Sequence, residues 1–141
     1  MSTQTFTAPT NKSNLIAQAK AELGKFLKIS KARQDQGKGQ NYMPGGLIDE
    51  VWHEMLQDRK SYEAFATKHA GSILEHNPNA GYGTLEWVPD YEARFGLLSE
   101  AWFADKNGVV DESAVAEYRA TGNYTTSWDC TPDSGDSPTP N

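Results

Sequence analysis

The stretch that decides the fold is GLIDEVWHEML, residues 46–56 of a chain of 141 residues. Its apolar side chains recur every three to four positions, which is the spacing of one helical face. They are Leu47, Val51 and Met55, extended by Ile48, Trp52 and Leu56. The sequence therefore predicts an amphipathic helix from about residue 47 to 58, with the Trp52 indole facing the protein interior.

The same helical period continues along most of the chain. We expect further helices from about residue 13 to 32, from 60 to 71, from Pro89 onward, and after Asp111, which can cap a short last helix. Residues 77–83 are rich in Asn, Pro and Gly and predict an irregular loop. The expected fold class is all-α: a compact bundle of about four to five helices with one irregular Gly/Pro/Asn loop and disordered ends.

The two ends of the chain have compositions that favour disorder. Residues 1–10 are rich in Ser and Thr, and residues 131–141 contain no large apolar residue, so little apolar burial would offset the entropy lost on ordering. We therefore expect a disordered segment at residues 1–10, a single helical domain at residues 11–126 and a flexible C-terminal tail at residues 127–141.

The overall composition excludes several classes of protein. The formal net charge is −6, and the basic residues gather in the first forty positions while the rest of the chain is acidic. No apolar run approaches the roughly 18 residues of a membrane helix, and the start lacks the pattern of a signal peptide. A single cysteine excludes an internal disulfide. We expect a cytoplasmic protein that binds neither membrane nor nucleic acid.

Chemistry-bearing residues concentrate in the helix expected at residues 47–58. Asp49 and His53 are four positions apart, so one helical face presents both side chains. If the loop after the third helix folds back, His76 joins them, and two histidines with one carboxylate suit zinc or a non-haem Fe(II) centre. Glu50 or Glu54 would then act as the catalytic base. The alternative is a structural pair in which Asp49 only orients His53, since the His-Glu-x-x-His pattern of zinc proteases is absent.

Several short motifs resemble those of the glycine-rich domain-containing protein family. They fall within roughly residues 47–103 and comprise Asp49-x-x-Trp52-His53-x-x-Leu56, then Tyr62 and Phe65, Gly71, and His76-x-Pro78. The resemblance, to the small stand-alone bacterial type, implies a small helical module of largely uncharacterised function. Ala66 and Glu75 depart from the family pattern, which has cysteine and histidine there, so a site using either residue would have lost a ligand.

Three functions remain open from the sequence, and the first is slightly favoured. A protein-interaction module would use Tyr82 and Trp87 in a Gly-containing loop as anchors for a protein partner. A mononuclear metal-binding protein or metalloenzyme would hold zinc or iron with the aspartate and two histidines named above; no cofactor is certain.

The third function is a carrier or a peptide substrate that presents its C-terminal tail. Trp128, Asp129 and Cys130 would then form the recognised or modified stretch. This function is suggested because Cys130 is the single cysteine and lies at the edge of the expected disorder. A free thiol without function explains the same observation equally well.

Overall fold

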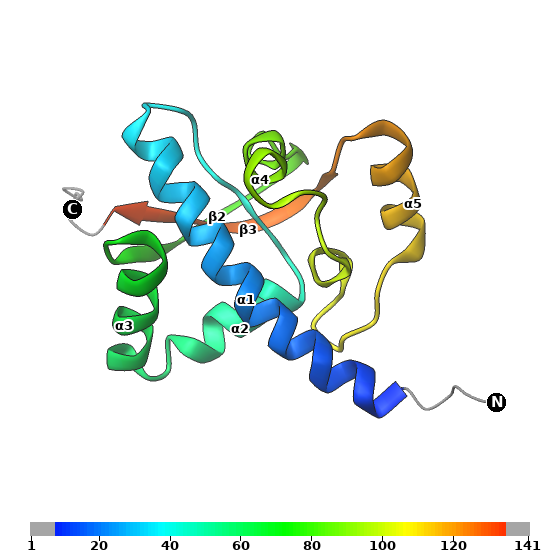
Figure 1. The fold of residues 1–141 in the computed structure, drawn as a ribbon, viewed down its shortest axis with the longest axis horizontal. Helices are drawn as coiled ribbons and strands as arrows, with labels where there is room; N and C mark the ends of the chain where they lie inside the picture. Colours follow the sequence, from blue (N-terminus) through cyan, green and yellow to red (C-terminus); the bar gives the residue numbers. More distant parts are fainter. Residues whose placement is uncertain (1–7, 135–141) are drawn as a thin grey trace.

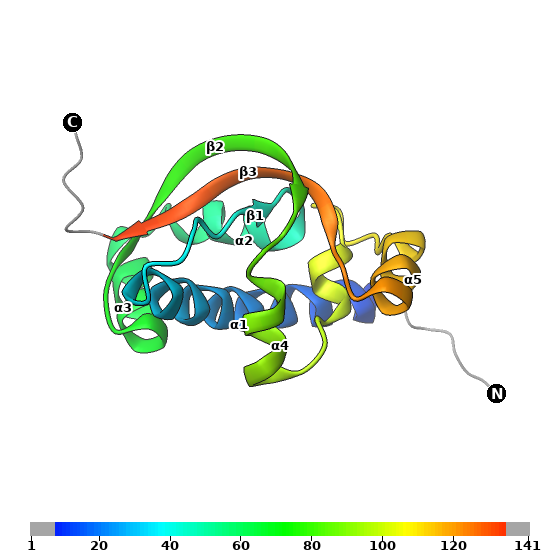
Figure 2. The same ribbon diagram turned by 90° about the horizontal axis from the view of Figure 1, so that it is seen from above.

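A computed structural model describes residues 8–134 of the chain (Figures 1 and 2). The elements, in chain order, are α1 (Ala8–Asp35), β1 (Met43–Pro44), α2 (Leu47–Met55), α3 (Arg59–Ala70), β2 (Leu74–Thr84), α4 (Val88–Phe95), the 3-10 helix η1 (Glu100–Phe103), α5 (Glu112–Thr121) and β3 (Thr125–Ser134). Figure 2 shows β2 and β3 arching over α1 and α2. Within residues 8–134, no helix is long and apolar enough to cross a membrane.

The expectation of an all-α bundle is wrong, because the three strands form an antiparallel sheet in the order β1-β3-β2. Strands β2 and β3 pair from Leu74 opposite Ser134 to Thr84 opposite Thr125, with a register shift between Pro78 and Gly81. The expected loop at residues 77–83 lies within β2. The fold is therefore mixed α/β, with helices packed under a small sheet.

Residues 77–83 form a strand and not a loop because packing against the neighbouring strand outweighs their local preference for a loop. Gly and Pro disfavour strands, but strand propensity depends strongly on the neighbouring side chains. The Trp128 indole of β3 lies against Gly81, where an added Cβ would come within 2.6 Å of the ring. The indole also stacks on Tyr42, with ring centroids 4.0 Å apart. The glycine is thus required by a distant tryptophan rather than by a turn.

The expected boundaries of the folded domain also need correction. Helix α1 begins at Ala8, inside the segment expected to be disordered, and β3 continues to Ser134, well into the expected tail. Strand β3 is the central strand of the sheet, and Cys130 on it is fully buried. Residues 127–134 are therefore part of the domain, while residues 1–7 and 135–141 lie outside the described part of the chain.

The helices expected from periodicity are present, and an aspartate caps the start of two of them. Asp58 accepts a hydrogen bond from the Ser61 backbone N–H at the start of α3, and Asp111 accepts one from Ala114 at the start of α5. The segment that begins near Pro89 divides into two: α4 ends at Phe95, and η1 forms separately.

The aromatic core forms around Phe26 in the middle of α1. Its ring lies at 6.2 Å from Trp52, 5.2 Å from Trp87 and 5.8 Å from Trp102, measured between ring centroids. Trp52 has no exposed surface, so the expectation that this indole faces inward is confirmed. Helix α2 is thereby held against α1 in a fixed orientation, which also fixes the direction of its polar face.

We predict that Trp52→Ala lowers the free energy of unfolding by about 3–5 kcal/mol, because it removes a large, fully buried aromatic side chain. Denaturant unfolding, monitored by circular dichroism with a chelator present, measures the change. The matched control is Tyr82→Ala, which removes an aromatic ring that is 73% exposed and should change stability by less than about 0.5 kcal/mol. Equal stability of the Trp52 variant and the parent would contradict the packing described here.

We also predict that Gly81→Ala destabilises the protein by about 1–3 kcal/mol, as overpacking does, because the new methyl group would overlap the Trp128 ring. Gly39→Ala is the control, since a Cβ there meets only the end of the Glu86 side chain at 3.8 Å. Thermal denaturation of the two variants side by side measures the difference. Equal melting temperatures would mean that Trp128 is not held against β2.

Candidate functional site

Three side chains from two distant elements meet where α2 faces the sheet. Asp49 and His53 come from α2 and His76 comes from β2. The Nε2 atoms of His53 and His76 are 2.8 Å apart. Asp49 Oδ1 lies 3.5 Å from His53 Nε2 and 3.7 Å from His76 Nε2. The structure thus brings together all three residues that the sequence suggests as metal ligands, and their donor atoms lie within 4.8 Å of one another.

Local structure explains how each side chain arrives there. The spacing of four residues places Asp49 and His53 one above the other on α2. His76 lies on β2 opposite Pro132, and its ring packs edge-on against Trp52, with centroids 4.8 Å apart at an angle of 81°. The indole that anchors α2 in the core therefore also supports one of the three site residues.

Asp49 is the buried member of the cluster, with its side chain only 9% exposed. Its Oδ1 accepts a hydrogen bond from the Cys130 thiol at 3.1 Å. Burial raises the pKa of this carboxyl, but the nearby His76, the thiol hydrogen bond and the charge of His53 outweigh it, so the pKa lies below its ordinary value. The carboxylate is therefore anionic at neutral pH.

The two histidines are more accessible than the aspartate. The side chain of His53 is 48% exposed and that of His76 is 17% exposed. A hydrogen bond between two Nε2 atoms requires one ring to donate and the other to accept, so at least one imidazole is neutral in this arrangement. A neutral imidazole with a free lone pair is the form that binds metal ions. The cluster is thus anionic on its buried side and open to solvent on its outer side.

Cys130 is the site residue that sequence reasoning placed in a different role. The sequence suggests an exposed tail of Trp128, Asp129 and Cys130, but Trp128 is half-buried and Cys130 is fully buried; Asp129 alone is exposed. Burial, reinforced by Asp49, raises the pKa of the Cys130 thiol well above its ordinary value. The thiol therefore acts as a hydrogen-bond donor to Asp49. Nothing local in the sequence signals this contact, which joins residues far apart in the chain.

Glu50 and Glu54, suggested as catalytic bases, face a different part of the surface. Both line a groove of about 520 Å³ between α1 and α2, together with apolar residues that include Ile16 and Met55. Two basic residues, Lys20 and Lys106, also line it. The structure thus places both glutamates in the lining of this groove, and their suggested role as catalytic bases stays a prediction.

The two suggested partner-binding aromatic residues differ in their surroundings. Tyr82 is 73% exposed on β2, whereas Trp87 is fully buried and its Nε1–H donates to the Tyr42 carbonyl oxygen at 2.8 Å. Trp87 therefore contributes to the core and is out of reach of a surface partner, which leaves Tyr82 as the accessible residue of the pair.

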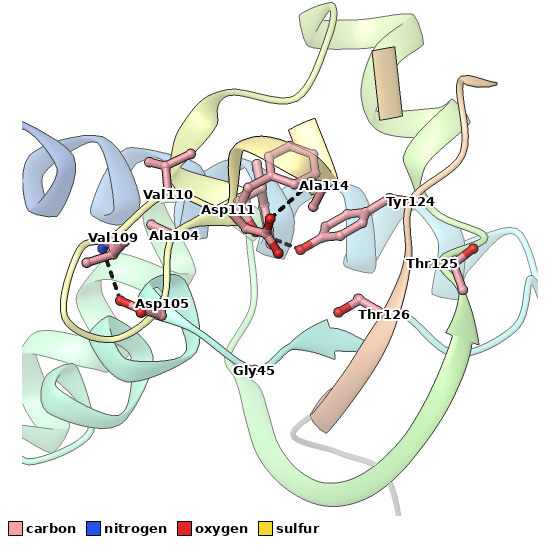
Figure 3. Close-up of a pocket in the computed structure, with 12 residues that line it drawn as sticks. Gly45, Ala104, Asp105, Val109, Val110, Asp111, Ala114, Tyr124, Thr125 and Thr126 are labelled. Atoms are coloured by element: carbon pink, nitrogen blue, oxygen red, sulfur yellow. Dashed lines mark hydrogen bonds between the residues drawn. The ribbon is translucent and has the colours of Figure 1, made fainter. Parts of the chain in front are cut away.

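A second pocket, of about 350 Å³, lies between η1, the start of α5 and the start of β3 (Figure 3). Its polar groups already have partners. Asp105 accepts hydrogen bonds from the Asn107 and Val109 backbone N–H groups, and Asp111 caps α5. The Tyr124 hydroxyl donates to the Trp102 carbonyl oxygen. These interactions stabilise the surrounding turns.

No protein-family model, curated protein or solved structure matches this chain. The resemblance to glycine-rich domain-containing proteins therefore stays a prediction. What can be said of function follows from the geometry of the cluster on this mixed α/β domain.

Proposed function

We propose that the protein binds a single zinc ion through Asp49 Oδ1, His53 Nε2 and His76 Nε2. The observation that carries the proposal is the convergence of these three donor atoms, from a helix and a strand, within 4.8 Å of one another. Two imidazoles and one carboxylate form a common zinc ligand set that leaves one coordination position open. The exposure of His53 would direct that position toward solvent.

The carboxylate–imidazole separations are compatible with a tetrahedral ion such as zinc. Donors about 2.0–2.1 Å from a tetrahedral ion lie about 3.3–3.4 Å apart, whereas on one face of an octahedron they lie about 3 Å apart. The carboxylate–imidazole separations of 3.5 and 3.7 Å exceed the octahedral value. The 2.8 Å separation of the imidazoles reflects their mutual hydrogen bond, which ion binding would replace.

An ion at this position would connect α2 to the edge strand β2. Asp49 and His53 lie on the helix and His76 on the strand, so a bound ion would act as a cross-link between these two elements. Because ligand binding to the folded state alone stabilises that state, zinc should raise the stability of the domain. The proposal is metal binding, with water or a donor from another molecule in the open position.

The other two functions have less structural support. The protein-interaction module suggested by the sequence retains Tyr82 as an exposed anchor, but its second anchor, Trp87, is buried. A carrier that presents Cys130 would need to release this buried residue from the central strand of the sheet. The metal site, by contrast, requires only that the two imidazoles give up their mutual hydrogen bond and separate slightly.

We predict that the chelator-treated protein binds one equivalent of zinc in isothermal titration calorimetry. At a free zinc concentration one hundred times the Kd, zinc should add about 2.7 kcal/mol to the free energy of unfolding. His76→Ala and His53→Ala should each abolish saturation at concentrations that saturate the parent, because each removes one of three ligands. Absence of stoichiometric binding by the parent protein would overturn the proposal.

The matched controls are Glu50→Gln and Glu54→Gln, which alter charge on the same helix but on the face that lines the groove. We expect both variants to bind zinc within about twofold of the parent, because charges near a solvent-exposed surface interact weakly. A loss comparable to that of the histidine variants would mean that zinc is bound by the acidic surface in general and not by the cluster.

A further inference from the structure

The Oδ1 atom of Asp49 is the point at which three polar groups meet. The Cys130 thiol donates to it at 3.1 Å, and both imidazole Nε2 atoms lie within 3.7 Å of it. Cys130 approaches from the central strand β3, where it is paired with Pro78 of β2 on one side and Met43 of β1 on the other. One carboxylate oxygen thus joins α2, β2 and β3.

The sheet register explains why Cys130 and His76 reach the same carboxylate. Directly paired residues of an antiparallel sheet project to the same face, and so do residues two apart along a strand. Cys130 is paired with Pro78, and His76 is two residues before Pro78. The thiol and the imidazole therefore share the face of the sheet that is turned toward Asp49.

We propose that Cys130 is a positioning residue of the metal site: its S–H group fixes the Asp49 carboxylate in the orientation that serves the ion and does not itself bind the ion. This inference rests on the proposed zinc function. It assigns a role to the single cysteine of the chain that requires no exposure and no modification.

The arrangement of the donor atoms distinguishes a positioning residue from a fourth ligand. The group of atoms that could share one ion contains Asp49, His53 and His76, and the sulfur of Cys130 is not within it. The thiol instead contacts the carboxylate, in surroundings where Cys130 is fully buried. The sulfur therefore reaches the cluster through its hydrogen bond to the carboxylate and not as a member of the group of possible ligand atoms.

The contribution of such a contact to metal affinity can be large. A ligating carboxylate that loses its hydrogen-bonding partner can rotate away from the ion, and removing partners of this kind costs about 10–100-fold in metal affinity. The thiol donates to the same Oδ1 atom that the two imidazoles approach, and the imidazoles would themselves turn toward the ion. The thiol is therefore the contact that remains to orient the carboxylate when zinc is bound.

Three substitutions separate orientation of Asp49 from packing of the core. Cys130→Ser keeps a donor, Cys130→Ala removes it and leaves a space, and Cys130→Val removes it while filling the space with apolar atoms. We expect the alanine and valine variants to bind zinc about 10–100-fold more weakly than the parent, and the serine variant to remain within about threefold. Titration calorimetry with zinc chloride measures affinity, and denaturant unfolding with chelator measures the stability of the metal-free form.

If Cys130 only packs in the core, zinc affinity should follow the stabilities of the three variants. Stability should be lowest for serine, which buries a hydroxyl among apolar groups, and highest for valine, which is the reverse of the order expected for affinity. Affinities that follow stability would overturn the proposal. Equal affinity of all three variants and the parent would also overturn it while leaving the zinc site intact, whereas a parent that binds no zinc would remove both proposals.

Cobalt substitution supplies the test for direct ligation. The parent loaded with Co²⁺ should lack a thiolate-to-metal charge-transfer band, and its visible spectrum should match that of the serine variant, because sulfur is outside the coordination sphere. A charge-transfer band that disappears in Cys130→Ser would identify the cysteine as a ligand and would overturn the positioning role.

Discussion

The antiparallel pairing of β2 with β3 is the constraint on which the site depends. It joins Leu74 to Ser134 and Thr84 to Thr125, and in doing so it carries His76 and Cys130 to the same face of one sheet. Helix α2 lies beneath that face with Asp49 turned toward it. Without the pairing, α2 would present only a helical Asp–His pair, which is common in proteins and has no particular chemistry.

The buried carboxylate of Asp49 shows how the sheet and the helix depend on each other electrostatically. An anion removed from water is unfavourable unless donors or positive charge compensate it. One donor is the Cys130 thiol, and the neighbouring imidazoles supply further compensation, which is why the pKa of Asp49 is lowered despite burial. A cation bound between the imidazoles would complete the compensation. The same charge that is costly to bury therefore favours a metal ion at this position.

The sequence predicts the helical half of this arrangement well and the strand half poorly. The 3.6-residue period locates α2, and the spacing of Asp49 and His53 follows from it directly. Strand β2 has no such signal, because its glycines are accommodated through contacts with Trp128, which lies far along the chain. The approach of His76 could be suggested only on the condition that its segment folds back. The contact between Cys130 and Asp49 could not be suggested, since no periodicity links a strand to a distant helix.

Trp52 shows why the core and the site are not independent in this protein. Its indole packs against Phe26 of α1 in the core and against the His76 ring at the site. The helix therefore cannot rotate to improve one contact without disturbing the other, because both contacts are made by a single side chain. Close packing fixes Trp52 in position, and the position of His76 relative to Asp49 is fixed with it. The geometry of the proposed zinc site is in this sense set by the aromatic core, and His53 is its most exposed member.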